Sequence, residues 1–152
     1  MHVLDIWSRY IENSPGFFEH VILMVCKRSR EIAASLCLQD PDNLSPGQQE
    51  FLRSFAEKMH SYLAQTLALP ESEQAAAARS LGERHVHITI YWDVYAMVIS
   101  QALEQLNPPP APLEIFAWQR FFTAHINHMR EGYEAEDRKN GLRRKSTQVD
   151  QA

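Results

Sequence analysis

The chain has 152 residues, 45% of them hydrophobic and 22% charged, which suits one globular domain and leaves little room for two separate cores. Its formal net charge of −4 gives the domain as a whole no nucleic-acid-binding signature, so no nucleic acid is expected among its partners. Only five glycines occur, and the long segments between turn residues are rich in good helix formers, so we predict an all-α fold.

Three features of the sequence indicate the cellular compartment in which the protein is expected. No apolar run reaches the roughly 18 residues that a membrane-spanning helix needs, so no membrane is expected as a partner. The N-terminal residues lack the basic start and apolar core of a signal peptide. Cys26 and Cys37 lie on apolar stretches and are predicted to be buried free thiols in a reducing environment. These features together predict a cytoplasmic protein.

Turn residues divide the first part of the chain into helical pieces. Residues 2–13 form the first predicted helix, with its apolar residues on one stripe. Residues 15–38 form a second helical region, for which Ser14 is the expected N-cap and Pro15 the expected first-turn residue.

The third predicted helix begins at Ser45. Ser45, Pro46 and Gln48 match a capping box with proline at the first helical position. The residues that follow show the i, i+4 spacing of one buried helical face, at Phe51, Phe55, Met59, Tyr62 and Leu63. After Pro70, a short alanine-rich helix is predicted over residues 71–83.

The second half of the chain is also predicted to be helical, except at its start and end. Residues 84–91 alternate and are β-branched, so they are predicted to be an extended segment between helices. Residues 92–106 form a strongly apolar helix, and the last helix runs from about Pro112 into the 130s. The basic segment 137–152 is predicted to be a flexible tail or linker, which leaves a domain of six to seven helices over residues 1–136. The residues expected on the inner face of the last helix are Leu113, Ile115, Phe116, Trp118, Phe121, Phe122, Ile126 and Met129.

The most specific pattern is the stretch LGERHVHITIYWDVY around His85. In flavohaemoglobins and related single-domain haemoglobins, the proximal histidine often follows a basic residue, with an apolar residue five positions later and a tyrosine ten positions later. His85, Ile90 and Tyr95 stand at those positions. The stretch is also similar to globin-coupled sensors, whose pattern His-x-x-Ile-x-Ile is matched by His85, Ile88 and Ile90. The chain therefore resembles bacterial globins over about residues 3–136.

The resemblance implies a globin-like helical fold that binds haem b, with His85 as the proximal iron ligand. The flat apolar macrocycle needs a slot between two helical layers. The implied function is binding of a diatomic gas (O2, CO or NO), as a sensor or a carrier. The residues expected to line the haem are Ile22, Leu36, Phe51, Phe55, Met59, Val86, Ile90, Tyr95, Val98 and Leu103.

The resemblance also implies details on the two sides of the haem. Tyr95 is expected to contribute to the hydrogen bonds that orient His85. Ile22 stands where bacterial globins that bind oxygen tightly usually carry a tyrosine, and no phenylalanine lies between Phe18 and Phe51. The distal pocket is therefore expected to be largely apolar. A sixth ligand from the protein stays open, with four candidates: Met59, His60, Met24 and His20.

Alternatives to this interpretation remain. In the first alternative, His87 is the iron ligand in place of His85. In the second, the domain is a haem-free globin fold used for regulation or protein interaction. No nucleophile, phosphate-loop or dinucleotide motif occurs, so enzymatic activity is not expected, although a haem activity that depends on an external reductase stays open. The spacing of four other histidines matches no structural zinc pattern, so they are expected to be solvated surface residues rather than a metal cluster. These are His20, His60, His125 and His128.

Two macromolecular partners are implied by the similarity to sensor globins. One is a second copy of the chain, in a homodimer formed through the last two helices. The other is a signalling output partner, which the basic continuation of the last helix would reach.

Overall fold

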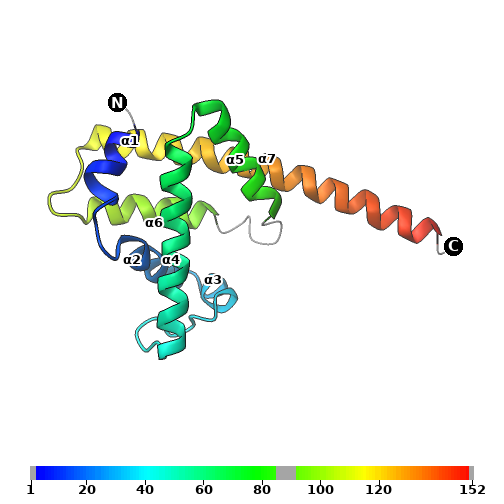
Figure 1. Cartoon of the computed structure of the whole chain (residues 1–152). Coiled ribbons are helices and arrows are strands. Elements are labelled where there is room, and N and C mark those ends of the chain that lie inside the picture. Colours follow the sequence, from blue (N-terminus) through cyan, green and yellow to red (C-terminus); the bar gives the residue numbers. More distant parts are fainter. Residues whose placement is uncertain (1–2, 85–91, 151–152) are drawn as a thin grey trace.

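The structure, a computed structural model, describes residues 3–84 and 92–150, and the surroundings of their side chains up to Leu142. Every regular element in these ranges is a helix, which confirms the predicted all-α fold class (Figure 1). None of these described helices combines the length and apolarity needed to cross a bilayer. The elements are α1 (Val3–Ile6), the π-helix η1 (Trp7–Ile11), α2 (Phe17–Arg28), α3 (Arg30–Ser35), α4 (Pro46–Leu67), α5 (Glu71–Arg84), α6 (Trp92–Glu104) and α7 (Pro112–Asp150).

Side-chain caps set the start of two helices. At the start of α4, the backbone N–H of Gln48 donates to Oγ of Ser45 at 3.2 Å, and the backbone N–H of Ser45 donates to Oε1 of Gln48 at 2.8 Å. This reciprocal pair confirms the predicted capping box. At the start of α3, Oγ of Ser29 accepts a hydrogen bond from the backbone N–H of Ile32 at 3.3 Å. A capped start at Ser29 explains why the predicted region 15–38 contains two helices, α2 and α3, instead of one.

The expected start of α2 is wrong in detail. The helix begins at Phe17 after Gly16, and no side chain caps it, whereas Ser14 was expected to cap a helix that starts at Pro15. Gly16 has a φ of 75°, in the left-handed region that glycine adopts with little strain. The chain therefore completes a turn, in which the N–H of Phe17 donates to the carbonyl of Ser14 at 3.3 Å, before the helix starts.

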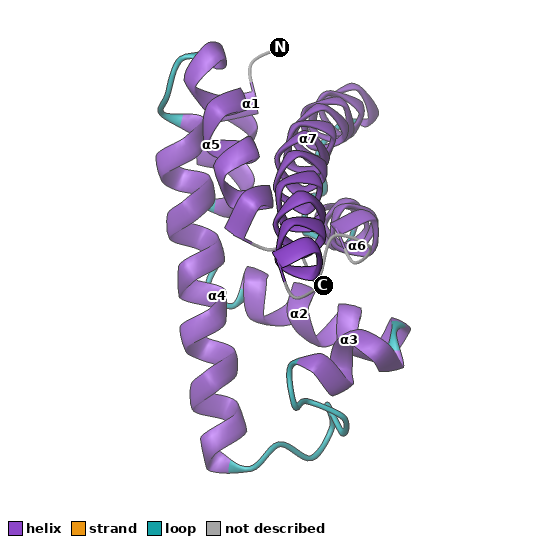
Figure 2. Ribbon diagram, turned by 90° about the vertical axis from the view of Figure 1, so that its right-hand side faces the viewer, coloured by secondary structure: helices purple, strands orange, loops and turns teal. Residues whose placement is uncertain are grey.

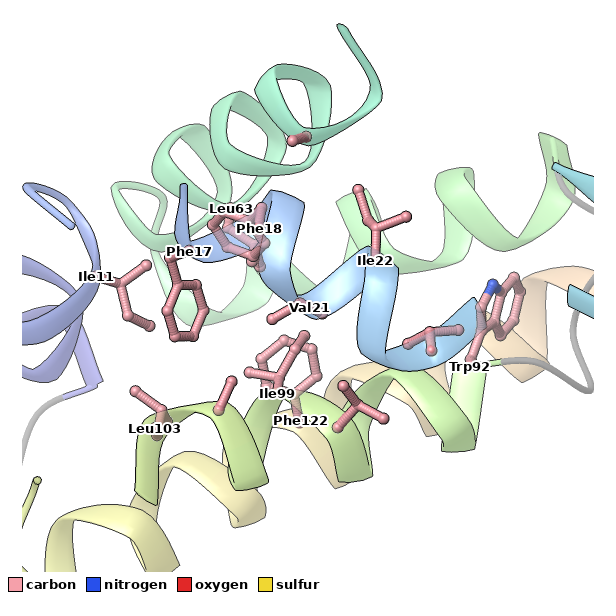
Figure 3. Close-up of a cluster of buried hydrophobic side chains, with 14 of the residues drawn as sticks. Ile11, Phe17, Phe18, Val21, Ile22, Leu63, Trp92, Ile99, Leu103 and Phe122 are labelled. Atoms are coloured by element: carbon pink, nitrogen blue, oxygen red, sulfur yellow. The ribbon is translucent and has the colours of Figure 1, made fainter. Parts of the chain in front are cut away.

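The core forms where α2 lies between α4 and α6. α2 packs against both of these helices, and α5 and α6 both pack against α7 (Figure 2). Phe17, Phe18, Val21 and Ile22 of α2 point into a cluster that Leu63 of α4 and Ile99 and Leu103 of α6 complete (Figure 3). All of these side chains are buried. Burial of each large apolar side chain stabilises the fold by roughly 1.5–3 kcal/mol relative to its exposure to water.

The last helix is longer than predicted. α7 is a single helix of 39 residues that continues to Asp150 and extends away from the other helices (Figure 1). The flexible tail expected over residues 137–152 is therefore helical as far as it is described. Asn140 and Gly141, residue types that often end helices, lie inside α7. One glycine in an exposed helix interior lowers the stability of the helix by only about 1 kcal/mol, which is too little to end a helix of this length.

Three expectations about individual side chains are wrong. Leu113 and Phe116 were expected to face inward from α7, but they are 72% and 56% exposed. The buried face of α7 instead carries Glu114 and Trp118, and Leu113 and Phe116 are displaced from it by the helical rotation. Cys26 is buried as predicted, whereas Cys37 is exposed because it follows α3 in a turn, with a φ of 58°.

Candidate functional site

The residues predicted to line a haem differ in burial. Ile22, Val98 and Leu103 are completely buried, at 0% exposure, among other apolar side chains. Leu36, Phe55, Met59 and Tyr95 are half-buried against the core, and Phe51 is 42% exposed. The remaining predicted residues lie outside the described part of the chain: His85, Val86 and Ile90, together with the alternative ligand His87.

One face of α4 carries an apolar row formed by Phe51, Phe55 and Met59, which is exposed at Phe51 and half-buried at the other two. The rings of Phe51 and Phe55 stack with their centroids 5.9 Å apart and their planes at 25°. The described chain leaves this row only partly covered, although aromatic side chains of this size are usually buried when they gather on one face. A flat apolar group such as a porphyrin fits a surface of this kind, so the residues present suit one wall of the predicted slot.

The C-terminal half of α5 is held by a close crossing with α7. A Cβ atom at Gly82 would lie 1.9 Å from the carbonyl oxygen of Met129, and one at Gly132 would lie 2.0 Å from the carbonyl oxygen of Arg79. Real Cβ atoms essentially never come closer than 3.0 Å, so this crossing requires glycine at both positions. Ala78, one turn before Gly82, is completely buried on the same face of α5.

This crossing matters to the predicted site because α5 ends at Arg84, the residue before His85. α4 and α5 are joined by residues 68–70, and α5 descends beside the C-terminal part of α4 (Figures 1 and 2). The backbone of α7 therefore fixes the point from which the chain enters the segment that contains His85.

Tyr95 belongs to α6, one turn after the buried Trp92. Burial raises the pKa of Tyr95 well above its usual range, and the nearby Cys26 thiol adds to the shift. The hydroxyl group therefore stays protonated at every physiological pH and remains a hydrogen-bond donor. This chemistry is compatible with the role predicted for Tyr95 beside an iron-ligating histidine.

Two of the four candidates for a sixth iron ligand have partners elsewhere in the fold. The ring of His60 lies 4.9 Å from the ring of Trp7, and its Nε2 atom is 3.4 Å from the backbone carbonyl of Glu12. Nε2 of His20 forms a hydrogen bond of 3.0 Å with Oε1 of Gln105. The other two candidates, Met24 and Met59, are half-buried against the core.

A buried pair between α4 and α7 was missed by the sequence analysis, which expected His125 to be a solvated surface residue. His125 is only 5% exposed, and the hydroxyl of Tyr62 lies 2.8 Å from its Nε2 atom. Burial lowers the pKa of His125 to about 4 and raises that of Tyr62 to about 12, so both groups are neutral near pH 7. A signal was present, because Trp118, Phe122, His125 and Met129 follow the i, i+4, i+7, i+11 spacing of one helical face.

His128 takes part in a different cluster on the same helix. Its Nδ1 atom and Nε of Arg79 both contact Oε2 of Glu131, at 3.2 and 2.9 Å, and these two hydrogen bonds lower the pKa of Glu131. Among the described residues, no three histidine, cysteine, aspartate or glutamate side chains gather closely enough to hold a metal ion. His125 and His128 therefore contact different partners, Tyr62 and Glu131.

Comparisons with known proteins do not assign the chain to a family. No protein-family profile, curated protein or solved structure matches it. The function has to be argued from the residues and their arrangement.

Proposed function

We propose that the chain is a haem-binding globin that binds a diatomic gas, with His85 as the proximal iron ligand. The observation that carries this proposal is the partly covered apolar row on α4, formed by Phe51, Phe55 and Met59. α5 returns along α4 and ends at Arg84, so the chain reaches His85 from a helix beside the one that bears this row. An apolar wall and an imidazole ligand are what a haem requires from its protein.

The haem iron would supply the position at which the gas binds. The protein's own residues would exclude water and orient the group: Phe51 and Phe55 through apolar contact, and Tyr95 as a protonated donor. The Ile22 side chain is apolar and completely buried, so it offers no hydrogen bond to a bound gas. This favours carbon monoxide, nitric oxide or weakly held oxygen over a strongly stabilised oxygen complex.

The unbroken α7 supports a sensor rather than a carrier. It packs against α5, which leads to His85, and it continues as a helix to Asp150 beyond the other helices. A change near the iron would therefore reach the basic end of the chain through one continuous element. We place such a sensor in the cytoplasm, in keeping with the free thiols of Cys26 and Cys37.

We also infer that two copies associate through α6 and α7. Leu113 and Phe116 are strongly exposed on α7, and Met97 is 43% exposed on α6. Pairing of these helices across a two-fold axis would cover apolar surface that a monomer leaves in water. Analytical ultracentrifugation should show a dimer that Phe116→Glu dissociates, and a monomer at high concentration would contradict the inference.

The test of the main proposal is a visible absorption spectrum of the purified protein supplied with haem. We expect one haem per chain and a Soret band that shifts with carbon monoxide. His85→Ala should abolish this spectrum, and the matched control His87→Ala should retain it. The reverse result would make His87 the ligand and overturn the assignment of His85.

A haem-free globin domain used in regulation or protein interaction is the second candidate. The observation that favours it is the complete burial of Ile22, Val98 and Leu103 against neighbouring apolar side chains. If the wild-type protein takes up no stoichiometric haem, the gas-binding proposal is discarded and this alternative is retained.

A further inference from the structure

A second candidate site lies away from the predicted haem. A groove of about 670 Å³ runs between α1, α5 and α7, and it contains none of the residues expected to line the haem. This volume falls within the range of small-molecule sites, roughly 300–1,000 Å³. The groove has an apolar surface formed by Val3, Ala75, Ala117, Phe121 and Ala124.

His125 lines this groove and leaves one ring nitrogen for a ligand. The Tyr62 hydroxyl lies 2.8 Å from Nε2 of His125, and burial keeps that hydroxyl protonated. Nδ1 is the ring nitrogen that remains, and it carries the imidazole proton in the tautomer in which Nε2 accepts from Tyr62. No described residue forms a hydrogen bond with Nδ1. Among buried side-chain nitrogen and oxygen atoms of the described chain, only Nε1 of Trp118 lacks a partner. Nδ1 of His125 is therefore open to the groove that this residue lines, and not sealed in the core.

Arg120 supplies a positive charge to the same groove. Its guanidinium group lies over the ring of Phe116 at 5.9 Å and has no carboxylate within ion-pair distance among the described residues. The carboxylate of Glu131, further along α7, is bonded to Arg79 and His128. Glu71 is the one carboxylate that lines the groove, and it is exposed in the first turn of α5.

We propose that this groove binds an organic monocarboxylate with an apolar body of medium chain length. The carboxylate accepts hydrogen bonds from Arg120 and from Nδ1–H of His125, and the chain lies on Phe121 and the surrounding alanines. The guanidinium and the imidazole N–H offer donors only, which match a carboxylate and not an amine. In the proposed complex Nε2 of His125 accepts from the Tyr62 hydroxyl, which leaves the imidazole proton on Nδ1 for the ligand.

The test uses sodium octanoate as the probe and isothermal titration calorimetry as the assay. We expect saturable binding at one site per chain. Arg120→Ala should weaken binding about tenfold or more, because a hydrogen bond to a charged group is lost. Arg138→Ala is the matched control, since Arg138 is an exposed arginine on the same helix outside the groove, and it should bind octanoate as the wild type does. Octylamine, with the same apolar chain and the opposite charge, should not bind.

A nitrogen-15 NMR spectrum of the histidine rings provides a second readout. Octanoate should shift the Nδ1 resonance of His125. Absence of saturable octanoate binding, equal affinity in Arg120→Ala, equal binding of octylamine, or an unshifted His125 resonance would each overturn the proposal. If the chain binds no haem, the octanoate measurements still test the groove, because none of them depends on haem.

Discussion

The crossing of α5 and α7 predicts an unusually severe effect of adding one methyl group. In Gly132→Ala, the new Cβ atom would lie 2.0 Å from the carbonyl oxygen of Arg79, where at least 3.0 Å is needed. The obstacle is backbone, which has no rotamer to escape into, so the helices must separate by about 1 Å along this contact. Overpacking of this kind costs typically 1–3 kcal/mol and occasionally more, and the better helix propensity of alanine offsets about 1 kcal/mol. Because the new Cβ meets backbone, the cost should lie at the upper end of this range, and we expect a net loss of about 2 kcal/mol in the free energy of unfolding.

Urea unfolding followed by circular dichroism at 222 nm measures this loss. Gly82→Ala should behave like Gly132→Ala, because its Cβ would meet the carbonyl of Met129. Gly141→Ala is the matched control on the same helix: nothing lies within 4 Å of its Cβ position, so it should stabilise the protein by up to about 1 kcal/mol. If Gly132→Ala is as stable as Gly141→Ala, the two backbones do not touch as described and the reasoning is refuted.

Three further predictions concern polar groups. Burial lowers the pKa of His125 to about 4 in the folded protein, whereas in the unfolded chain this histidine has its ordinary pKa of about 6.5. Between these two pH values the unfolded chain binds a proton that the folded protein does not. Between pH 6.5 and pH 4, the free energy of unfolding of the wild type should fall by about 3 kcal/mol more than that of His125→Phe. Parallel pH profiles of the two proteins would contradict this. Glu114 is buried and accepts hydrogen bonds from Arg9, from the Tyr10 hydroxyl and from the backbone N–H of Ala111. Glu114→Ala should therefore lower the free energy of unfolding by about 1–3 kcal/mol, and a change within error would show that these bonds are not maintained. Ser45→Ala removes the N-cap of α4 and should cost about 1 kcal/mol by the same urea assay, whereas no loss would mean that Gln48 alone satisfies the helix start.

Local signals in the sequence predicted the helices well. The capping box at Ser45 and the apolar periodicity from Phe51 onward depend on residues within one or two turns, and the helix follows where they predict it. The start of α2 was misplaced because Gly16 adopts a left-handed conformation that its neighbours do not reveal.

Features that depend on packing between distant segments were harder to predict. The burial of His125 requires the hydroxyl of Tyr62, which lies 63 positions earlier in the chain. Gly82 meets the backbone of Met129 and Gly132 meets the backbone of Arg79, each about 50 positions away in the sequence, and nothing near either glycine indicates this contact. The proposed haem ligand His85 depends on a resemblance and on a segment outside the described residues, so it remains a prediction.

The length of α7 also makes it a mechanical lever. Its fulcrum is the contact at Gly132, where the helix is pinned to α5, and the part beyond that residue reaches about 27 Å at 1.5 Å per residue. A tilt of about 5° at the fulcrum moves the far end by about 2 Å, which equals the helix shifts that switch many regulated proteins. Small adjustments of α5 are therefore magnified at the distant end of the chain.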